Sequence, residues 1–196
     1  KVEIIALTRR KVTGGGGNVH WEKADFMAWN ESLDACFIDI DAVFVTVGTT
    51  KAKTPDEAQY AFIDRDIPIR AAQSAVKHNV PYYAVVSSAG ADASSSNFYL
   101  RTKGEMENGV RESGLKHIRI MRPGFLLGER NEFRLGERIG GWLMRLFSPL
   151  LPASLAKYRG IEARTVARAM LMGYFENPEI SIHENAEIRR LSNQNP

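Results

Sequence analysis

The stretch VPYYAVVSSAGADASSSNFYLRTKGEMENGVRESGLKHIRIMRPG, residues 80–124, decides the fold of this chain. Residues 80–86 form an apolar run that predicts a buried strand ending in two serines. Residues 94–97 are all of types that cap helix N-termini, and a helical pattern follows them. Residues 117–121 predict the beginning of the next strand. The order strand, helix, strand is typical of a parallel sheet covered by helices.

Within this stretch, three side chains predict a proton-transfer site. Tyr99 and Lys103 are four residues apart, so they share one face of the predicted helix. An ammonium group one helical turn from a phenol favours the phenolate, which lets tyrosine exchange a proton with a substrate oxygen. Ser88, or its neighbour Ser87, can hold the same oxygen. We therefore predict Ser88, Tyr99 and Lys103 as catalytic residues.

The rest of the chain continues the alternation of strands and helices. Residues 2–7, 19–21 and 42–47 predict strands, and residues 60–78 predict a helix in which Pro68 causes a kink or marks a first turn. Residues 63, 67, 71 and 75 form the inward stripe of that helix. After residue 123, helical spacing returns at residues 135–147 and 165–175, with a strand at 180–183. We predict one α/β domain over residues 1–196, with residues 131–196 as a small C-terminal cap.

Several short motifs give the chain a resemblance to a known family. They are VVSSAGAD at 85–92, NFY at 97–99, KGE at 103–105, RPGFLL at 122–127, VGTT at 47–50 and HENAEI at 183–188. With these motifs the chain resembles the atypical short-chain dehydrogenase/reductases, and within them the Tat-interacting-protein-like, or oxidoreductase-like, subgroup. The resemblance covers nearly the whole chain and implies a doubly wound parallel Rossmann sheet that binds NAD(P).

The same resemblance assigns cofactor contacts and reveals a departure from the family pattern. It implies adenine contacts from Asp25 and Phe26, ribose and pyrophosphate contacts from Gly48 and Thr49, and nicotinamide contacts from Lys103, Pro123 and Phe125. It aligns residues 2–7 with the second strand of the fold. The first strand and its glycine-rich turn are therefore expected to be missing from this chain, since Gly14–Gly17 leads into a strand rather than a helix.

The end of that second strand indicates which nicotinamide cofactor is preferred. An acidic residue there would bind the ribose hydroxyls of NAD, but this chain has Arg9 and Arg10. Guanidinium groups bind a 2′-phosphate in a bidentate, charge-assisted way. We therefore predict NADP, with NAD the less favoured cofactor; two ordinary surface arginines are the alternative.

Composition limits the remaining function classes. A formal net charge of +3 over 196 residues gives no argument for nucleic acid. The single cysteine, Cys36, excludes an internal disulfide and favours a reducing, cytoplasmic location. No apolar run is long enough to span a membrane, and the four histidines lack the spacing of metal ligands.

Two main functions remain open. The first is an NADP-dependent oxidoreductase that acts on a small carbonyl or alcohol substrate. The second is a non-catalytic NADPH-binding regulator that interacts with a protein partner, because a fold does not fix a function. A nucleotide-sugar epimerase or dehydratase is a third option, but the short cap disfavours so large a substrate. The sequence does not distinguish a homodimer from a monomer.

Overall fold

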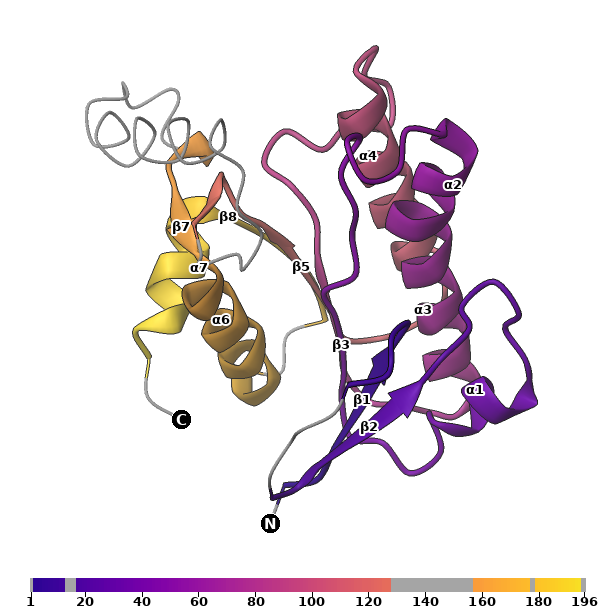
Figure 1. The fold of residues 1–196 in the computed structure, drawn as a ribbon. Coiled ribbons are helices and arrows are strands. Elements are labelled where there is room, and N and C mark those ends of the chain that lie inside the picture. Colours follow the sequence, from indigo (N-terminus) through magenta and orange to yellow (C-terminus); the bar gives the residue numbers. More distant parts are fainter. Residues whose placement is uncertain (1, 13–16, 128–156, 177–178, 195–196) are drawn as a thin grey trace.

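The protein has an α/β fold in which helices lie on both sides of parallel strands, as the sequence predicts (Figure 1). The computed structural model describes residues 2–12, 17–127, 157–176 and 179–194. Its central sheet has the order β3-β4-β5-β8, and all neighbouring strands are parallel. These strands are β3 (Val43–Val45), β4 (Tyr83–Val86), β5 (Ile118–Arg122) and β8 (Ile180–Glu184).

A second, separate parallel pair is formed by β1 (Ile4–Thr8) and β2 (Val19–Lys23). In the described residues, β1 and β3 are not paired with each other. The Rossmann strand order places one further strand between them. The exposure of β3 agrees with this gap between the strands. Phe44 of β3 is 43% exposed, although it is a large apolar residue in a strand.

One face of the central sheet is covered by a long helical run and by α4 (Phe98–Arg111), with the short α1 (Glu31–Ala35) beside them (Figure 1). The run consists of α2 (Glu57–Ala61), a π-helical segment η1 (Phe62–Asp66) and α3 (Ile67–Lys77). Pro68 lies in the first turn of α3, where its missing N–H is tolerated. The wider π-helical turn precedes it, so the run continues without a break.

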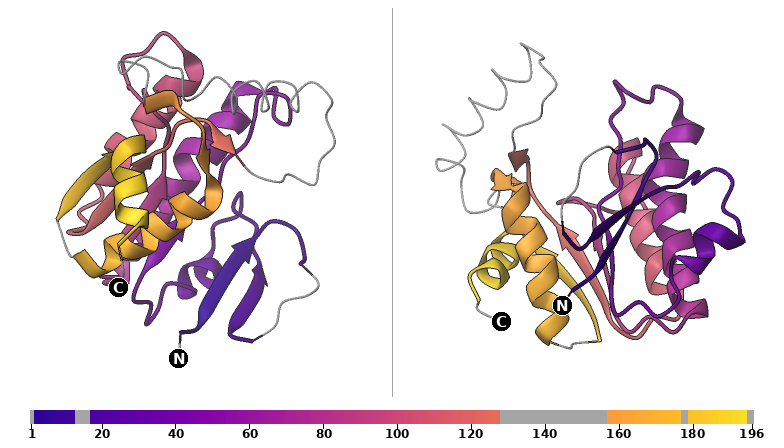
Figure 2. Two further views of the ribbon diagram at one scale, coloured as in Figure 1. Left: turned by 90° about the vertical axis from the view of Figure 1, so that its left-hand side faces the viewer. Right: turned by 60° about the horizontal axis from the view of Figure 1, so that its bottom comes forward.

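The opposite face is covered by α6 (Ala163–Glu176) and α7 (Asn185–Ser192), which pack against each other (Figures 1 and 2). Strand alternation explains how both faces are filled. Tyr83 and Val85 pack into the cluster under α3 and α4, whereas Tyr82 and Ala84 pack into the cluster under α6 and α7. Both faces of β4 are therefore apolar, as is typical of a central parallel strand.

The C-terminal part joins the main fold directly. The predicted helix at 165–175 corresponds to α6, and the predicted strand at 180–183 corresponds to β8, which pairs with β5. Two short strands, β6 (Leu126–Leu127) and β7 (Ile161–Glu162), pair in parallel beside them. The predicted helix at 135–147 and the predicted cap boundary at residue 131 lie outside the described residues, as does most of the glycine run.

The helix α4, which carries Tyr99 and Lys103, is fixed at its start and along one side. The side chain of Asn97 accepts a hydrogen bond from the backbone N–H of Leu100 at 3.1 Å, so it caps the helix as its residue type suggests. Gly104 allows the helix to approach the preceding loop closely. A Cβ atom at Gly104 would lie only 2.1 Å from the backbone nitrogen of Ala93.

Candidate functional site

Because parallel strands end at the same edge of a sheet, the segments after β3, β4 and β5 lie at one end of the molecule. These segments carry Gly48 and Thr49, Ser87 and Ser88, and Pro123, respectively. The backbone N–H of Ala89 donates to the carbonyl of Pro123 at 2.9 Å, which joins two of them. Four of the predicted site residues, Gly48, Thr49, Ser88 and Pro123, therefore share this edge.

The two serines after β4 have different environments. Ser87 is buried, and its hydroxyl donates a hydrogen bond to the carboxylate of Glu107 on α4. Ser88 is partly exposed, and its hydroxyl has only a long contact of 3.5 Å with the neighbouring carbonyl of Ala89. Of the two hydroxyls, that of Ser88 is the more available to a ligand.

Tyr99 and Lys103 occupy successive turns at the start of α4. Tyr99 is 39% exposed, whereas the side chain of Lys103 is only 6% exposed. Lysine is seldom buried without a charge partner. Here the partner is Asp64 of η1, whose Oδ1 lies 2.9 Å from the Lys103 Nζ.

Asp64 is a residue that the sequence-based prediction missed. Its second carboxylate oxygen accepts a hydrogen bond from the backbone N–H of Thr49 at 2.8 Å. Asp64 therefore bonds both to the predicted catalytic helix and to the turn after β3. An inward-facing lysine requires an acidic partner, so the sequence indicates that such a partner exists but not which acidic residue it is.

A second tyrosine lies beneath this group. Tyr60 of α2 is buried, and its hydroxyl lies 3.4 Å from the carbonyl oxygen of Thr49. Burial, together with the negative charge of Asp64, raises the pKa of Tyr60 well above its ordinary value. Tyr60 is therefore a neutral packing residue at this site, and the accessible phenol is that of Tyr99.

A second buried carboxylate, Glu107, supports the end of β4. Arg122 at the end of β5 donates to both of its oxygens, from Nε at 2.8 Å and from Nη2 at 2.6 Å. Arg122 also lies 3.3 Å from Glu184. The hydrogen bond to Glu107 raises the pKa of Arg122 above its ordinary value, so this cation stays charged.

The residues predicted to contact the adenosine end lie together after β1 and β2. The backbone N–H of Ala24 donates to the carbonyl of Thr8 at 2.8 Å, which places the two strand ends side by side. Arg9, Arg10 and Asp25 are exposed, and Phe26 is partly buried. Within the described residues, the guanidinium groups of Arg9 and Arg10 have no hydrogen-bond or ion-pair partner.

The side of the site near the predicted nicotinamide contacts is formed by two backbone segments. Gly124 packs so closely on residues 157–159 that a Cβ atom there would lie 2.3 Å from the carbonyl oxygen of Arg159. Pro123 is buried, and Phe125 is exposed. The hydroxyl of Tyr158 lies close to Gly90, at 3.0 Å from the position that a Cβ atom would take.

Two groups of these residues have a chemistry that suits a nicotinamide dinucleotide, namely the arginines after β1 and the turn after β3. Unpaired arginines at a strand end suit a phosphate, and the exposed Gly48 leaves the turn after β3 free of a side chain. The glycine-rich turn that holds the pyrophosphate in this fold has no counterpart after β1 in the sequence. The pyrophosphate contacts expected of Gly48 and Thr49 after β3 therefore stay a prediction, without the support of a glycine-rich turn after β1.

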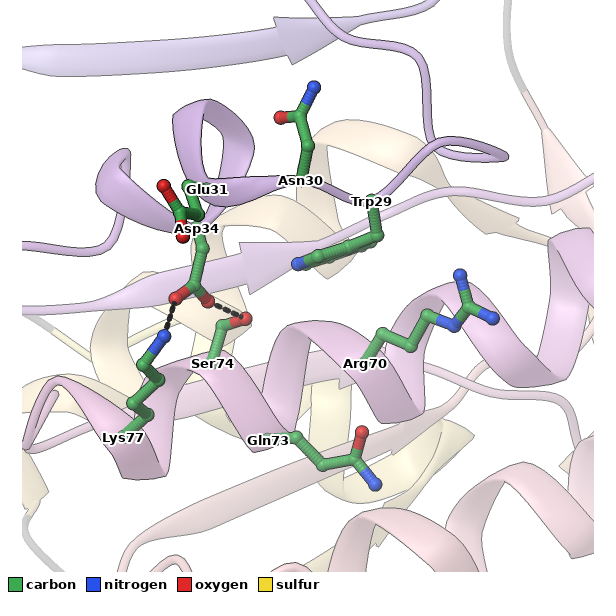
Figure 3. Close-up of a pocket in the computed structure, with 8 residues that line it drawn as sticks. All are labelled: Trp29, Asn30, Glu31, Asp34, Arg70, Gln73, Ser74 and Lys77. Carbon is green, nitrogen blue, oxygen red and sulfur yellow. Dashed lines mark hydrogen bonds and ion pairs between the residues drawn. The ribbon is translucent and has the colours of Figure 1, made fainter.

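A separate groove of about 580 Å³ lies between α1 and α3 and contains none of the predicted site residues (Figure 3). It includes Trp29 and Arg70, and at one end Asp34 is bonded to Ser74 and Lys77. The hydrogen bond from Lys77 holds the pKa of Asp34 well below its ordinary value. Both carboxylate oxygens of Asp34 are thus engaged in structural hydrogen bonds. The groove is separate from the predicted proton-transfer residues.

Two kinds of site are not found in the described residues. No cluster of three histidine, cysteine or acidic side chains there could hold a metal ion. None of the helices described has the length and apolar character needed to cross a membrane.

Comparison with known proteins identifies the family. The model of the NAD(P)H-binding family matches residues 2–140. The chain therefore belongs to the NAD(P)H-binding, atypical short-chain dehydrogenase/reductase-like proteins, as its motifs suggested. It is 37% identical to Protein HTATIP2 of Rattus norvegicus over 172 residues, which cover 86% of this chain and 69% of the rat protein. It is 32% identical to Protein FMP52, mitochondrial, of Candida albicans, over 78% of this chain and 73% of the yeast protein.

Solved structures agree on the fold. MoeE5 in complex with UDP-glucose and NAD matches with a TM-score of 0.67 at 14% identity, over 97% of this chain and 72% of that chain. The UDP-glucuronic acid 4-epimerase from Bacillus cereus in complex with NAD has a TM-score of 0.65 at 11% identity, over 94% of this chain and 70% of that chain. At such identities the likeness supports the Rossmann-type fold alone.

The relatives also correct one prediction. A cytoplasmic location was expected, but several fungal relatives are named as mitochondrial proteins, including those of Candida albicans and Emericella nidulans. The prediction is wrong because its basis was too general. A single free cysteine, Cys36, excludes an internal disulfide but does not distinguish one reducing compartment from another.

Proposed function

We propose that this protein is an NADP-dependent oxidoreductase that reduces a small carbonyl compound or oxidises the corresponding alcohol. The observation that carries the proposal is the pairing of an accessible phenol, Tyr99, with a buried lysine, Lys103, one helical turn below it. A buried ammonium group at this position supports a role in proton transfer and ribose binding. Membership of an NAD(P)H-binding family supports the cofactor class.

In this proposal each residue has one role. When bound, NADPH supplies the hydride that goes to the carbonyl carbon. Tyr99 gives the proton of its hydroxyl to the carbonyl oxygen, and the hydroxyl of Ser88 donates a hydrogen bond to the same oxygen. Lys103 holds the nicotinamide ribose and favours the phenolate that Tyr99 becomes. Pro123 and Phe125 border the nicotinamide, and Gly48, Thr49, Asp25 and Phe26 contact the adenosine half.

Replacing Tyr99 tests the proton-transfer role. Tyr99→Phe removes one hydroxyl and leaves the ring, so NADPH affinity should stay within a few-fold of the parent value. Turnover of aldehydes, ketones or quinones should fall by about 10²- to 10⁴-fold, as is typical of a lost general acid. Tyr174→Phe on α6 is the matched control. Equal turnover by the parent and Tyr99→Phe proteins would show that Tyr99 is not the proton donor.

Arg9 and Arg10 support NADP rather than NAD, because two unpaired guanidinium groups suit a 2′-phosphate. The Arg9→Ala, Arg10→Ala double variant should bind NADPH about 10- to 100-fold more weakly, which corresponds to the loss of about 1.5–3 kcal/mol in charge-assisted hydrogen bonds. NADH affinity should be unchanged. Titration calorimetry measures both, with Arg164→Ala as a control. Equal affinities of the parent protein for NADH and NADPH would contradict the preference.

The second candidate function is a non-catalytic NADPH-binding regulator. It is favoured by one observation, that the ammonium group of Lys103 is already occupied by Asp64. For a regulator, NADPH binds tightly, no substrate of the panel reacts, and Tyr99→Phe has no effect on binding. The turnover assay above therefore separates the two functions.

The names of the fungal relatives support a mitochondrial location for this protein as well. Subcellular fractionation of cells that produce the natural protein tests this location. Recovery of the protein with cytosolic markers rather than with mitochondria would contradict it.

A further inference from the structure

The ion pair between Asp64 and Lys103 is almost fully buried. The side chains are 2% and 6% exposed, and the charged atoms are 2.9 Å apart. A buried ion pair is weak evidence for stability, because the loss of hydration offsets most of the attraction between the charges. A role other than stabilisation is therefore worth seeking for Asp64.

Joining η1 to α4 does not require this pair. The next residue along η1, Arg65, already binds Glu105 of α4 at 2.9 Å, and both side chains are partly exposed. The two elements are thus held together by a contact that costs less hydration. The buried pair is a second connection, directed at the one lysine that the proposed function uses.

The second oxygen of Asp64 shows where this connection leads. It accepts the hydrogen bond from the backbone N–H of Thr49, in the turn after β3. The carboxylate lies directly against this turn, since a Cβ atom at Gly48 would be in van der Waals contact with Oδ1 at 3.4 Å. Asp64 sits in a π-helical segment, a rare geometry that is frequent at functional sites.

We infer that Asp64 is a positioning residue that sets the Lys103 ammonium group relative to the Gly48–Thr49 turn, so that both contact one bound nicotinamide dinucleotide. The inference rests on the proposed function, because it assumes that Lys103 and the turn bind the cofactor. Asp64 itself touches no cofactor atom; it acts through Lys103. Tyr60 lies close enough for the charge of Asp64 to raise its pKa, and the neighbouring Arg65 pairs with Glu105.

A double-mutant cycle in the full natural protein tests this inference. The variants are Asp64→Asn, Lys103→Met and the two combined, with NADPH affinity measured by fluorescence titration. Asn keeps an oxygen that can accept from Thr49 but removes the charge that holds Lys103. Asp64→Asn should weaken NADPH binding about five- to tenfold in the parent, and less than twofold in the Lys103→Met background. Asp66→Asn, two residues along, is the matched control and should leave affinity unchanged.

Each outcome decides the question. Equal losses from Asp64→Asn with and without Lys103 overturn the inference, because Asp64 then does not act through the lysine. A parent protein that binds no nicotinamide nucleotide overturns the proposed function and the inference together. If Asp64→Asn alone does not fold, the double variant still tests the idea, since it removes both charges at once. Its affinity must then match that of Lys103→Met, and a further loss overturns the inference. None of these measurements requires turnover.

Discussion

The strongest structural prediction concerns Glu107, the buried carboxylate that supports the end of β4. Three donor groups converge on it, namely the hydroxyl of Ser87 and two guanidinium nitrogens of Arg122. Replacing Glu107 by glutamine keeps the shape of the side chain but changes one acceptor into a donor. Ser87 can turn its hydroxyl to accept from the new amide, but Arg122 cannot accept. One of its two short hydrogen bonds is therefore lost whichever way the amide lies.

The size of the effect follows from this count. The loss of one charge-assisted hydrogen bond costs about 1.5–3 kcal/mol. The side chain of Arg122 is 21% exposed and also lies near Glu184. Water and Glu184 can partly replace the lost acceptor, so the lower half of that range applies. A decrease of about 2 kcal/mol in the free energy of unfolding lowers the melting temperature of a chain this long by about 4–8 °C.

Urea unfolding followed by tryptophan fluorescence measures this decrease, with Glu112→Gln as the control. Glu112 is exposed at the end of the same helix, so its variant should unfold like the parent. If Glu107→Gln and Glu112→Gln unfold at the same urea concentration as the parent, the three converging hydrogen bonds contribute nothing and the argument is refuted.

Two further predictions concern pH and packing. Burial, together with the charge of Arg119, lowers the pKa of His183, so the folded protein resists its protonation; the stabilising contribution is present above the unfolded pKa and is lost as the pH falls. The urea concentration at half-unfolding should therefore decrease when the pH is lowered from about 7 to about 5. The decrease should be smaller in His183→Gln than in the His20→Gln control. An equal decrease in the two variants would contradict this prediction. Gly104→Ala should lower the free energy of unfolding by about 3 kcal/mol, because the added Cβ atom would clash with the backbone of Ala93. A thermal melt like that of the parent would show that the loop at Ala93 moves away without cost.

The α/β class could be predicted because it depends on local pattern. Residues 80–86 are an apolar run of strand length, and residues 117–121 were predicted as the following strand; they correspond to the neighbouring strands β4 and β5. Capping residues, above all Asn97, marked the start of α4. Each of these signals is contained within a few consecutive residues, so no knowledge of the tertiary structure was needed.

The charge partners could not be predicted in the same way. The spacing of residues 60–78 suggested Ile63 on the inward stripe, but the structure buries Asp64 and leaves Ile63 partly exposed. The π-helical turn at Phe62–Asp66 changes the phase of the helix at this point. An acidic residue, Asp64, then faces inward. Its charge is balanced by Lys103 of α4, a helix that is distant in the sequence but packs against η1. Pattern alone contains neither the change of phase nor the partner.

The environment of α4 connects the two buried carboxylates into one arrangement. Tyr99, Lys103 and Glu107 follow each other at intervals of four residues, so they form a single polar stripe along the helix. The stripe passes from an accessible phenol to two buried charges, each held by a residue of another element: Lys103 by Asp64, and Glu107 by Arg122. A helix that served only to cover the sheet would be stabilised by apolar residues at these positions. The stripe therefore fixes the rotation of α4 against the ends of β3, β4 and β5, and with it the direction in which Tyr99 faces.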